Sequence, residues 1–205
     1  MKFIRKNAKW IVMLVCAVLF LWIVDNIFEN DIDKFDYIIY SMVLITMHPI
    51  TTSFLKIITY FGDWMIIIPV CIICVIFLKE KRYKYLVASN LVIIFILNQA
   101  LKMLFNRQRP VGNRLIEASG YSFPSGHSMV SMAFYGLLIY LAYKNIKNKK
   151  IKYAICIGLT LLIVLIGISR IYLGVHYASD VAGGFLLSIA YLIVFTQITK
   201  AKQEV

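Results

Sequence analysis

Long apolar runs separated by short polar segments dominate the chain. Each run is close to the roughly 20 residues that an α-helix needs to cross the apolar core of a bilayer. The runs fall at residues 10–28, 64–78, 85–105, 124–143, 153–171 and 177–198. The pattern therefore predicts an all-α protein, a bundle of six transmembrane helices that forms a single integral-membrane domain over residues 1–205.

Residues 37–61 do not fit this pattern. The apolar stretch 37–47 is short, His48 and Pro49 close it, and the run that follows carries Lys56. We interpret these residues as short interfacial or re-entrant helices after the first span. A full additional span here would reverse the orientation of everything downstream and would place the lysine-rich loops outside, against the charge bias of membrane proteins.

Composition and charge agree with a membrane protein. The hydrophobic fraction is 61% and the mean hydropathy is +0.80, whereas soluble domains are roughly 45–50% apolar. The net charge is +12, but Lys and Arg form short clusters between apolar runs, which is not the pattern of a nucleic-acid-binding protein. The first run follows a basic segment and lacks a cleavage pattern, which indicates an uncleaved signal anchor.

The basic clusters also predict the orientation. They precede the first run and fill the loops 79–84 and 144–152, whereas most acidic residues lie in the alternate segments. Because cytoplasmic loops are enriched in Lys and Arg, we expect a multi-pass plasma (cell) membrane protein with both termini cytoplasmic. Cys71 and Cys74 form a C-x-x-C without a second ligand pair, so we expect them to pack within a helix.

Three polar strings interrupt the apolar pattern between residues 102 and 180. Ionisable groups so close to a membrane are costly, and they usually mark a functional site. We expect the strings to meet at the extracytoplasmic end of the bundle. They read K-x₆-R-P, P-S-G-H and S-R-x₅-H-x₃-D, and they contain Lys102, Arg109, Ser125, Gly126, His127, Arg170, His176 and Asp180.

The cations and the glycine predict a phosphate site. Each guanidinium of Arg109 and Arg170 can hold two phosphate oxygens, and Lys102 adds a point charge. Gly126 lies at a predicted helix start, where free N–H groups and the positive end of the helix dipole attract an anion. Ser125 either donates its hydroxyl to the phosphate or caps the helix.

The remaining polar residues predict phosphoryl transfer through a phosphohistidine. His176 and Asp180 are four residues apart, so on one helix face the carboxylate can accept an imidazole N–H and leave the other nitrogen as a nucleophile. His127 then serves as general acid and base, and Ser169 is expected to orient Arg170. We expect no metal or cofactor, because three cations would repel a divalent ion from the same pocket.

The three strings resemble the signature of the type 2 phosphatidic acid phosphatase family, which shares its site with vanadium haloperoxidases. The resemblance covers roughly the C-terminal half of the chain. It implies a metal-independent phosphatase of lipid phosphates, built as a six-helix membrane bundle with its site at the outer face. It also implies that His176 is the nucleophile, Asp180 its partner and His127 the acid. The implied phosphate clamp is Lys102, Arg109, Ser125, Gly126 and Arg170.

Two other functions remain open from the sequence, a vanadium-dependent haloperoxidase-like activity and a non-catalytic lipid-phosphate carrier. Six spans favour a membrane-borne substrate, and a carrier would need the cations but not the acid and the nucleophile. Phosphatidylglycerophosphate, undecaprenyl diphosphate and phosphatidic acid all fit as substrates. Arg107 and Arg114 either meet a second phosphate or are solvated loop charges. The oligomeric state is not readable from the sequence.

Overall fold

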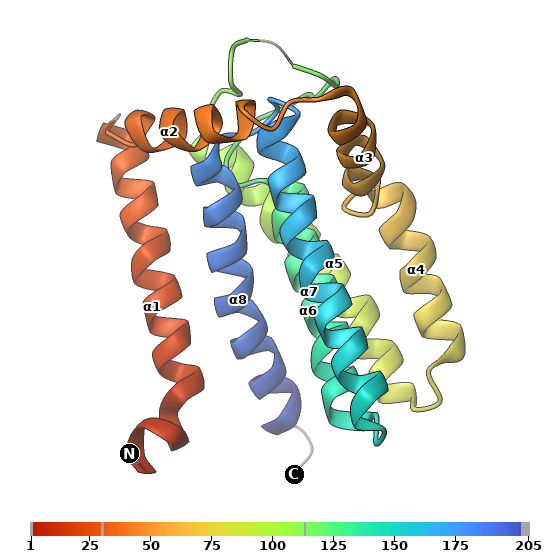
Figure 1. Cartoon of the computed structure of the whole chain (residues 1–205). Coiled ribbons are helices and arrows are strands. Elements are labelled where there is room, and N and C mark those ends of the chain that lie inside the picture. Colours follow the sequence, from red (N-terminus) through yellow and green to blue (C-terminus); the bar gives the residue numbers. More distant parts are fainter. Residues whose placement is uncertain (1, 30, 113, 202–205) are drawn as a thin grey trace.

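Helices are the only regular elements in the part of the chain that this computed structural model describes, residues 2–29, 31–112 and 114–201. The long helices run side by side, and α1 begins at the end of the bundle where α8 finishes (Figure 1). They are α1 (Lys2–Glu29), α5 (Lys81–Phe105), α6 (Gly126–Asn145), α7 (Lys149–Tyr172) and α8 (Ala178–Ala201). The shorter helices are α2 (Asp33–Leu44), α3 (Pro49–Tyr60) and α4 (Trp64–Phe77).

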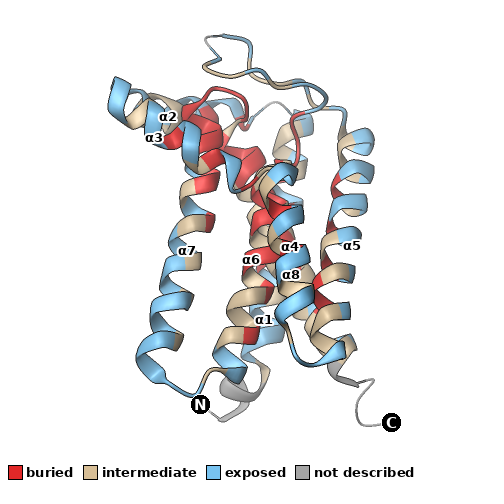
Figure 2. Ribbon diagram, turned by 90° about the vertical axis from the view of Figure 1, so that its right-hand side faces the viewer, coloured by how far each residue is buried: buried red, intermediate tan, exposed pale blue. Residues whose placement is uncertain are grey.

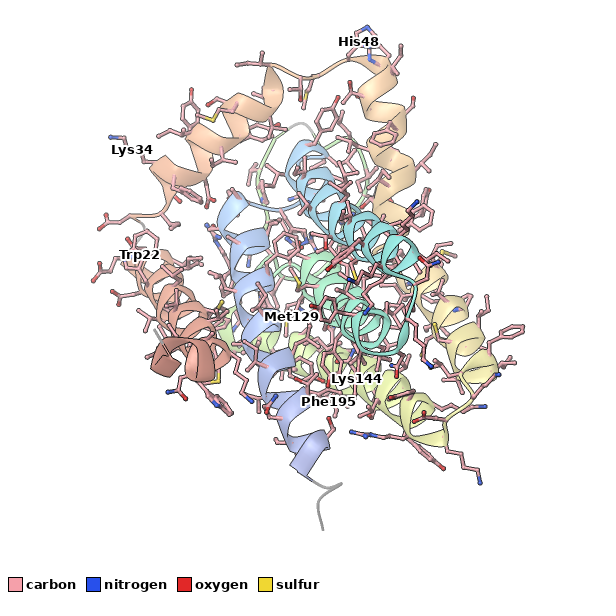
Figure 3. All side chains as sticks on the ribbon, turned by 60° about the horizontal axis from the view of Figure 1, so that its bottom comes forward. Trp22, Lys34, His48, Met129, Lys144 and Phe195 are labelled. Carbon is pink, nitrogen blue, oxygen red and sulfur yellow. The ribbon has the colours of Figure 1, made fainter. Side chains whose placement is uncertain are left out.

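Helix α6 is the centre of the bundle, where it packs against α5, α7 and α8. Met129 is fully buried and lies among these helices (Figure 3). Because α6 is enclosed by protein, it carries buried serines whose hydroxyls bond to its own backbone, such as Ser131 Oγ to the Ser128 carbonyl at 3.3 Å. This enclosure explains how α6 accommodates polar side chains inside the bundle.

Four helices are long and apolar enough to cross a membrane, namely α1, α5, α7 and α8. Helices α3 and α4 meet the same criterion only together, as a pair bent by 48°. Within the described residues the structure therefore supports four or five spans, and the predicted number of six is not confirmed. The run at 64–78 forms α4 with 14 residues, about 21 Å long, which is shorter than a hydrocarbon core of about 30 Å.

Short helices do follow the first span, as predicted for residues 37–61. Helix α2 lies across the ends of the long helices (Figure 1), and α3 packs against α7. Phe35, Ile38 and Met42 of α2 are exposed, whereas Asp36 is buried. A helix with an exposed apolar side that lies across a bundle is typical of the membrane surface.

Buried residues concentrate at the end of the bundle opposite the N-terminus (Figure 2). Farther along the bundle most outward side chains are apolar and exposed, as expected where lipid tails surround the helices. His48 lies at the outer edge (Figure 3), where its Nδ1 accepts a hydrogen bond from the Ile50 amide at 3.3 Å and caps α3. The other two histidines, His127 and His176, lie within the buried end.

Candidate active site

A cavity of about 1360 Å³ has a polar end and an apolar groove. Its apolar walls come from Ile67 and Cys71 of α4 and from Leu91, Val92 and Phe95 of α5. The polar end is lined by six of the predicted site residues, Lys102, Arg109, Gly126, His127, Arg170 and His176. The fold thus brings together residues from all three polar strings, beside a groove that suits a hydrocarbon chain.

His176 and Asp180 form the predicted pair, although not on one helix. His176 Nδ1 lies 3.3 Å from Asp180 Oδ2, and both side chains are buried. Helix α8 begins only at Ala178, so His176 belongs to the preceding loop and the contact is not a helical one. His176 Nε2 lines the cavity and is 3.0 Å from Arg109 Nη1, which fits a lone pair on Nε2.

Burial also sets the protonation of this histidine. Desolvation lowers the pKa of His176 to about 3, even though the hydrogen bond and charge of Asp180 act in the opposite direction. The imidazole is therefore neutral at physiological pH. A neutral ring whose Nδ1–H faces a carboxylate leaves a lone pair on Nε2, the nitrogen that the sequence analysis predicted as the nucleophile.

Asp180 is held by groups that the sequence analysis did not link to it. Its Oδ2 accepts hydrogen bonds from Ser122 Oγ at 2.5 Å and from the Tyr177 amide at 2.8 Å. Its Oδ1 accepts one from Arg107 Nη1 at 2.7 Å. Ser122 Oγ is also 3.3 Å from His176 Nδ1. The carboxylate is thus fixed on both oxygens before any substrate binds.

His127 has a carboxylate partner of its own. Its Nε2 lies 3.7 Å from Oδ2 of Asp63, whose Oδ1 caps α4 by accepting from the Met65 amide at 3.0 Å. The bend between α3 and α4 packs closely here, because a Cβ on Gly62 would lie 3.0 Å from His127 Cδ2. Sequence reasoning counted Asp63 only as an acidic residue on the outer side, and no local pattern links it to His127.

The three predicted cations surround the polar end of the cavity, and they differ in their hydrogen-bond partners. Lys102 Nζ donates to the Tyr121 carbonyl, and Arg109 donates to three backbone carbonyls at 2.8–2.9 Å. Arg170 is 4% exposed and donates from Nη1 to Thr59 Oγ1 at 2.6 Å. Among the described residues, the buried Nε of Arg170 has no hydrogen-bond partner. Arg170 as a residue lines the cavity, so its guanidinium lies close enough to the polar end to bind a phosphate oxygen.

Ser125 and Gly126 have different roles at the start of α6. Ser125 Oγ accepts from the Ser128 amide at 3.4 Å and caps α6, and the Ser125 amide donates to the Asp180 carbonyl at 3.1 Å. Ser125 does not line the cavity, which favours the capping role over direct phosphate binding. Gly126 does line it, and a Cβ there would meet Asn98 Oδ1 at 3.0 Å.

Two other polar residues, Ser169 and Arg107, differ from the sequence interpretation, whereas the exposed Arg114 matches one of its two alternatives, a solvated loop charge. Ser169 Oγ donates to the Ile166 carbonyl at 2.6 Å, so the expected contact with Arg170 is not formed. Arg114 donates to the Pro110 carbonyl of its own loop at 2.7 and 3.0 Å. Arg107 is neither a solvated charge nor a cavity residue, because aspartate carboxylates pair with it inside the protein.

Comparisons with known proteins agree with this geometry. The sequence profile described as the PAP2 superfamily matches residues 82–204, more than half of the chain. The chain belongs to the PAP2 superfamily. This confirms the resemblance to type 2 phosphatidic acid phosphatases.

Two curated PAP2 relatives match most of the chain. Phosphatidylglycerophosphatase B of Bacillus subtilis is 32% identical over 180 residues, which cover 83% of this chain and 86% of that protein. Undecaprenyl-diphosphatase of Sulfolobus acidocaldarius is 28% identical over 209 residues, which cover 95% of this chain and 94% of that protein.

The fold also matches a solved PAP2 structure. The crystal structure of a transmembrane PAP2-type phosphatidylglycerolphosphate phosphatase from Bacillus subtilis superimposes with a TM-score of 0.84 at 28% identity. The match covers 92% of this chain and 96% of that chain. The similarity therefore extends beyond residues 82–204 to the N-terminal helices.

Proposed function

We propose that this chain is a membrane phosphatase that removes the terminal phosphate of a lipid phosphate through a phosphohistidine on His176, without a metal ion. His127 acts as general acid and then as general base, and Asp180 orients His176. The clamp for the phosphoryl oxygens consists of Lys102, Arg109, Gly126 and Arg170, with Ser125 capping the helix start.

The observation that carries this proposal is the cavity with two ends. Cationic donors and two histidines line one end, and apolar side chains of α4 and α5 line the other. A molecule that fills both must carry a phosphate on a hydrocarbon chain. Arg170 lines the polar end, and the hydrogen bond from its Nη1 to Thr59 Oγ1 holds the guanidinium in place there.

In the first step, His176 Nε2 attacks phosphorus and the bond between phosphorus and the lipid oxygen breaks. The electron pair of that bond stays on the lipid oxygen, which receives a proton from His127. Asp180 stabilises the positive charge that develops on the His176 ring. Arg109 can exchange its contact with Nε2 for a phosphoryl oxygen, so the clamp tightens as charge develops on the oxygens in transit.

In the second step, water replaces His176 on phosphorus. His127, which is now neutral, takes a proton from the water as its oxygen bonds to phosphorus, and the phosphorus–nitrogen bond breaks with its electron pair returning to Nε2. Inorganic phosphate leaves, and His127 again carries the proton for the next turnover. Asp63 is the carboxylate that can pair with the ring while His127 carries the proton, because its Oδ2 lies 3.7 Å from His127 Nε2.

We also propose that six segments cross the membrane, with the site on the extracytoplasmic face. The two segments beyond α1, α5, α7 and α8 are the bent pair α3 and α4 and the enclosed helix α6. The basic loops 79–84 and 144–152 lie at the end of the bundle away from the site, which supports a cytoplasmic location for that end (Figure 1).

For the substrate we favour a phosphate monoester such as phosphatidylglycerophosphate, the class named for the Bacillus subtilis relative. The two arginines considered for a second phosphate both have partners within the protein. Lys56 on α3 lines the cavity outside the clamp, so a diphosphate such as undecaprenyl diphosphate remains the second substrate to test.

The deciding experiment is phosphate release by purified protein in detergent with EDTA, with His176→Ala as the blank. Phosphatidylglycerophosphate, undecaprenyl diphosphate and phosphatidic acid are offered in parallel. Release that survives EDTA and vanishes in the variant is the expected result, with the fastest rate on phosphatidylglycerophosphate. Full activity in a folded His176→Ala protein would overturn the mechanism, and EDTA-sensitive release would overturn metal independence.

A further inference from the structure

Arg107 joins two buried aspartates that are far apart in the sequence. Its Nη2 lies 2.9 Å from Asp36 Oδ2 in α2, and its Nη1 lies 2.7 Å from Asp180 Oδ1 in α8. Its side chain is 10% exposed, and its guanidinium lies 4.2 Å from the centre of the Tyr177 ring. One planar cation therefore bridges two carboxylates in a protected environment, where ion pairs are strong and loss of a partner is costly.

Asp36 also holds the residue beside Asp180. Its Oδ1 accepts a hydrogen bond from the Ser179 amide at 2.7 Å, and its Oδ2 accepts one from Ser179 Oγ at 2.6 Å. Ser179 Oγ is in turn 2.7 Å from Arg107 Nη1. Asp36 thus fixes the first turn of α8 through a backbone amide, a hydroxyl and an arginine at once.

These contacts affect the orientation of the Asp180 carboxylate. Asp180 Oδ1 is held by Arg107, which leaves Oδ2 to face His176 Nδ1. Arg107 fixes the carboxylate at Oδ1 and so complements the bonds that Ser122 and the Tyr177 amide make to Oδ2, because rotation of the carboxylate would break bonds at both oxygens.

We infer that Asp36 is a positioning residue for the reaction. It holds Arg107 and Ser179, and these fix the carboxylate of Asp180 and with it the imidazole of the nucleophile. The PAP2 profile begins at residue 82, so this contribution comes from outside the matched segment. Helix α2, which lies across the end of the bundle (Figure 1), is in this view part of the catalytic apparatus.

The inference rests on the proposed function, and its test uses a reaction that needs no lipid. Phosphoramidate can transfer its phosphoryl group to an imidazole nitrogen with release of ammonia, and the phosphorylation of His176 is followed by mass spectrometry. We expect Asp36→Asn to slow this labelling by about 10- to 100-fold, the range typical of a displaced reacting group. Asp33→Asn, an exposed aspartate in the same helix, is the matched control and should label like the wild type.

Lipid turnover gives a second measurement with a different signature. Asp36→Asn should lower kcat about as strongly as it lowers labelling, while KM and inhibition by inorganic phosphate stay within about twofold because the clamp is intact. Arg107→Lys keeps the charge but cannot span the same acceptors, so it should lower kcat in the same way even if Asp36→Asn folds poorly.

The double variant separates positioning from a general loss of structure. In an Asp180→Asn background, the change Asp36→Asn should have no further effect on kcat. Asp36 acts on His176 only through the carboxylate of Asp180, and that carboxylate is already absent. Multiplied losses in the double variant, or wild-type labelling by Asp36→Asn, would overturn the inference while leaving the proposed function in place. A wild-type protein that is not labelled at His176 would overturn both.

Discussion

Each histidine of the site faces a carboxylate, but the two pairs differ in burial and therefore in chemistry. Asp180 is fully buried and fixed on both oxygens, which suits an orienting role. Asp63 is 26% exposed and lies 3.7 Å from His127. Its side chain is therefore free to move closer to the imidazole when the ring is protonated and away from it when the ring is neutral. This difference fits the proposed mechanism, in which His176 is a neutral nucleophile and His127 gains and loses a proton.

The role of Asp63 predicts a dependence on the leaving group. Asp63→Asn should lower kcat on a lipid phosphate by about 10- to 100-fold, because an alkoxide needs a proton from His127. On p-nitrophenyl phosphate, whose leaving group needs no proton, the loss should stay within about threefold. Asn and Ser both cap helices, so Asp63→Asn and Asp63→Ser preserve α4 and test the carboxylate alone. Equal losses on both substrates would contradict the assignment.

The buried imidazole of His176 predicts a loss of stability in acid. Its pKa is lowered to about 3 by burial, against about 6.5 in an unfolded chain, so the unfolded state binds more protons between these values. The stabilisation from the neutral ring is complete above pH 6.5 and declines as the pH falls towards 3, by at most about 1.4 kcal/mol per pH unit.

Thermal unfolding in detergent at pH 7, 5 and 4 checks this expectation. His176→Asn cannot titrate, so the wild type should lose more stability than the variant as the pH falls. Parallel curves for the two proteins would show that the imidazole is not held neutral by the fold.

At the scale of elements, the start of α6 is the point where helix geometry and the phosphate site meet. Asn98 of α5 donates from Nδ2 to the Pro124 carbonyl at 3.2 Å, and this bond places its Oδ1 beside Gly126. The same helix end faces the cavity with amides that have no intrahelical partner. Helix α5 therefore supports the turn proposed to bind phosphate and also supplies Lys102.

This packing predicts a penalty for Gly126→Ala. The added Cβ would lie 3.0 Å from Asn98 Oδ1, which cannot retreat without weakening its bond to Pro124, so the helix start must shift. We expect kcat/KM to fall by about tenfold or more and inhibition by inorganic phosphate to weaken.

Gly158→Ala in α7 provides the matched control. A Cβ at Gly158 meets nothing within 4 Å, so activity should be unchanged and stability should rise by up to about 1 kcal/mol. If both glycine variants kept full activity, close packing at residue 126 would not matter for the reaction.

For the whole molecule, the two ends of the bundle differ in chemistry. The site, the loop segments 106–112 and 114–125 and α2 lie at one end, and the basic loops lie at the other (Figure 1). Between them the surface is apolar, as a lipid environment requires. The orientation proposed above follows from this polarity.

Cysteine labelling tests the orientation. Val111 is 98% exposed in the loop beside the site, and Lys147 is exposed in the loop between α6 and α7, whereas the native cysteines are buried or half-buried. A membrane-impermeant maleimide should label Val111→Cys in intact cells and Lys147→Cys only after permeabilisation. The opposite pattern would invert the proposed topology.

The sequence by itself determined the helical class, the positions of the long helices and the residues that line the polar end of the cavity. Apolar runs at 85–105 and 153–171 became α5 and α7 with boundaries within a few residues. Such features follow from local physics, because hydropathy and helix caps act over one or two turns of chain. The predicted end of the run at residue 105 coincides with the end of α5, where Asn106 adopts a left-handed conformation.

Only the tertiary structure decided how the reactive groups are held. Sequence reasoning did not assign partners to Asp36 and Asp63, because both read as charges on an outer loop. Asp36 and Ser179 are 143 positions apart in the sequence. They meet because α2 lies across the end of the bundle and brings Asp36 to the start of α8 (Figure 1). The local sequence pattern of either segment does not predict such a long-range contact. The contact depends on how the helices pack against each other, whereas the local pattern reflects only which residues favour a helix.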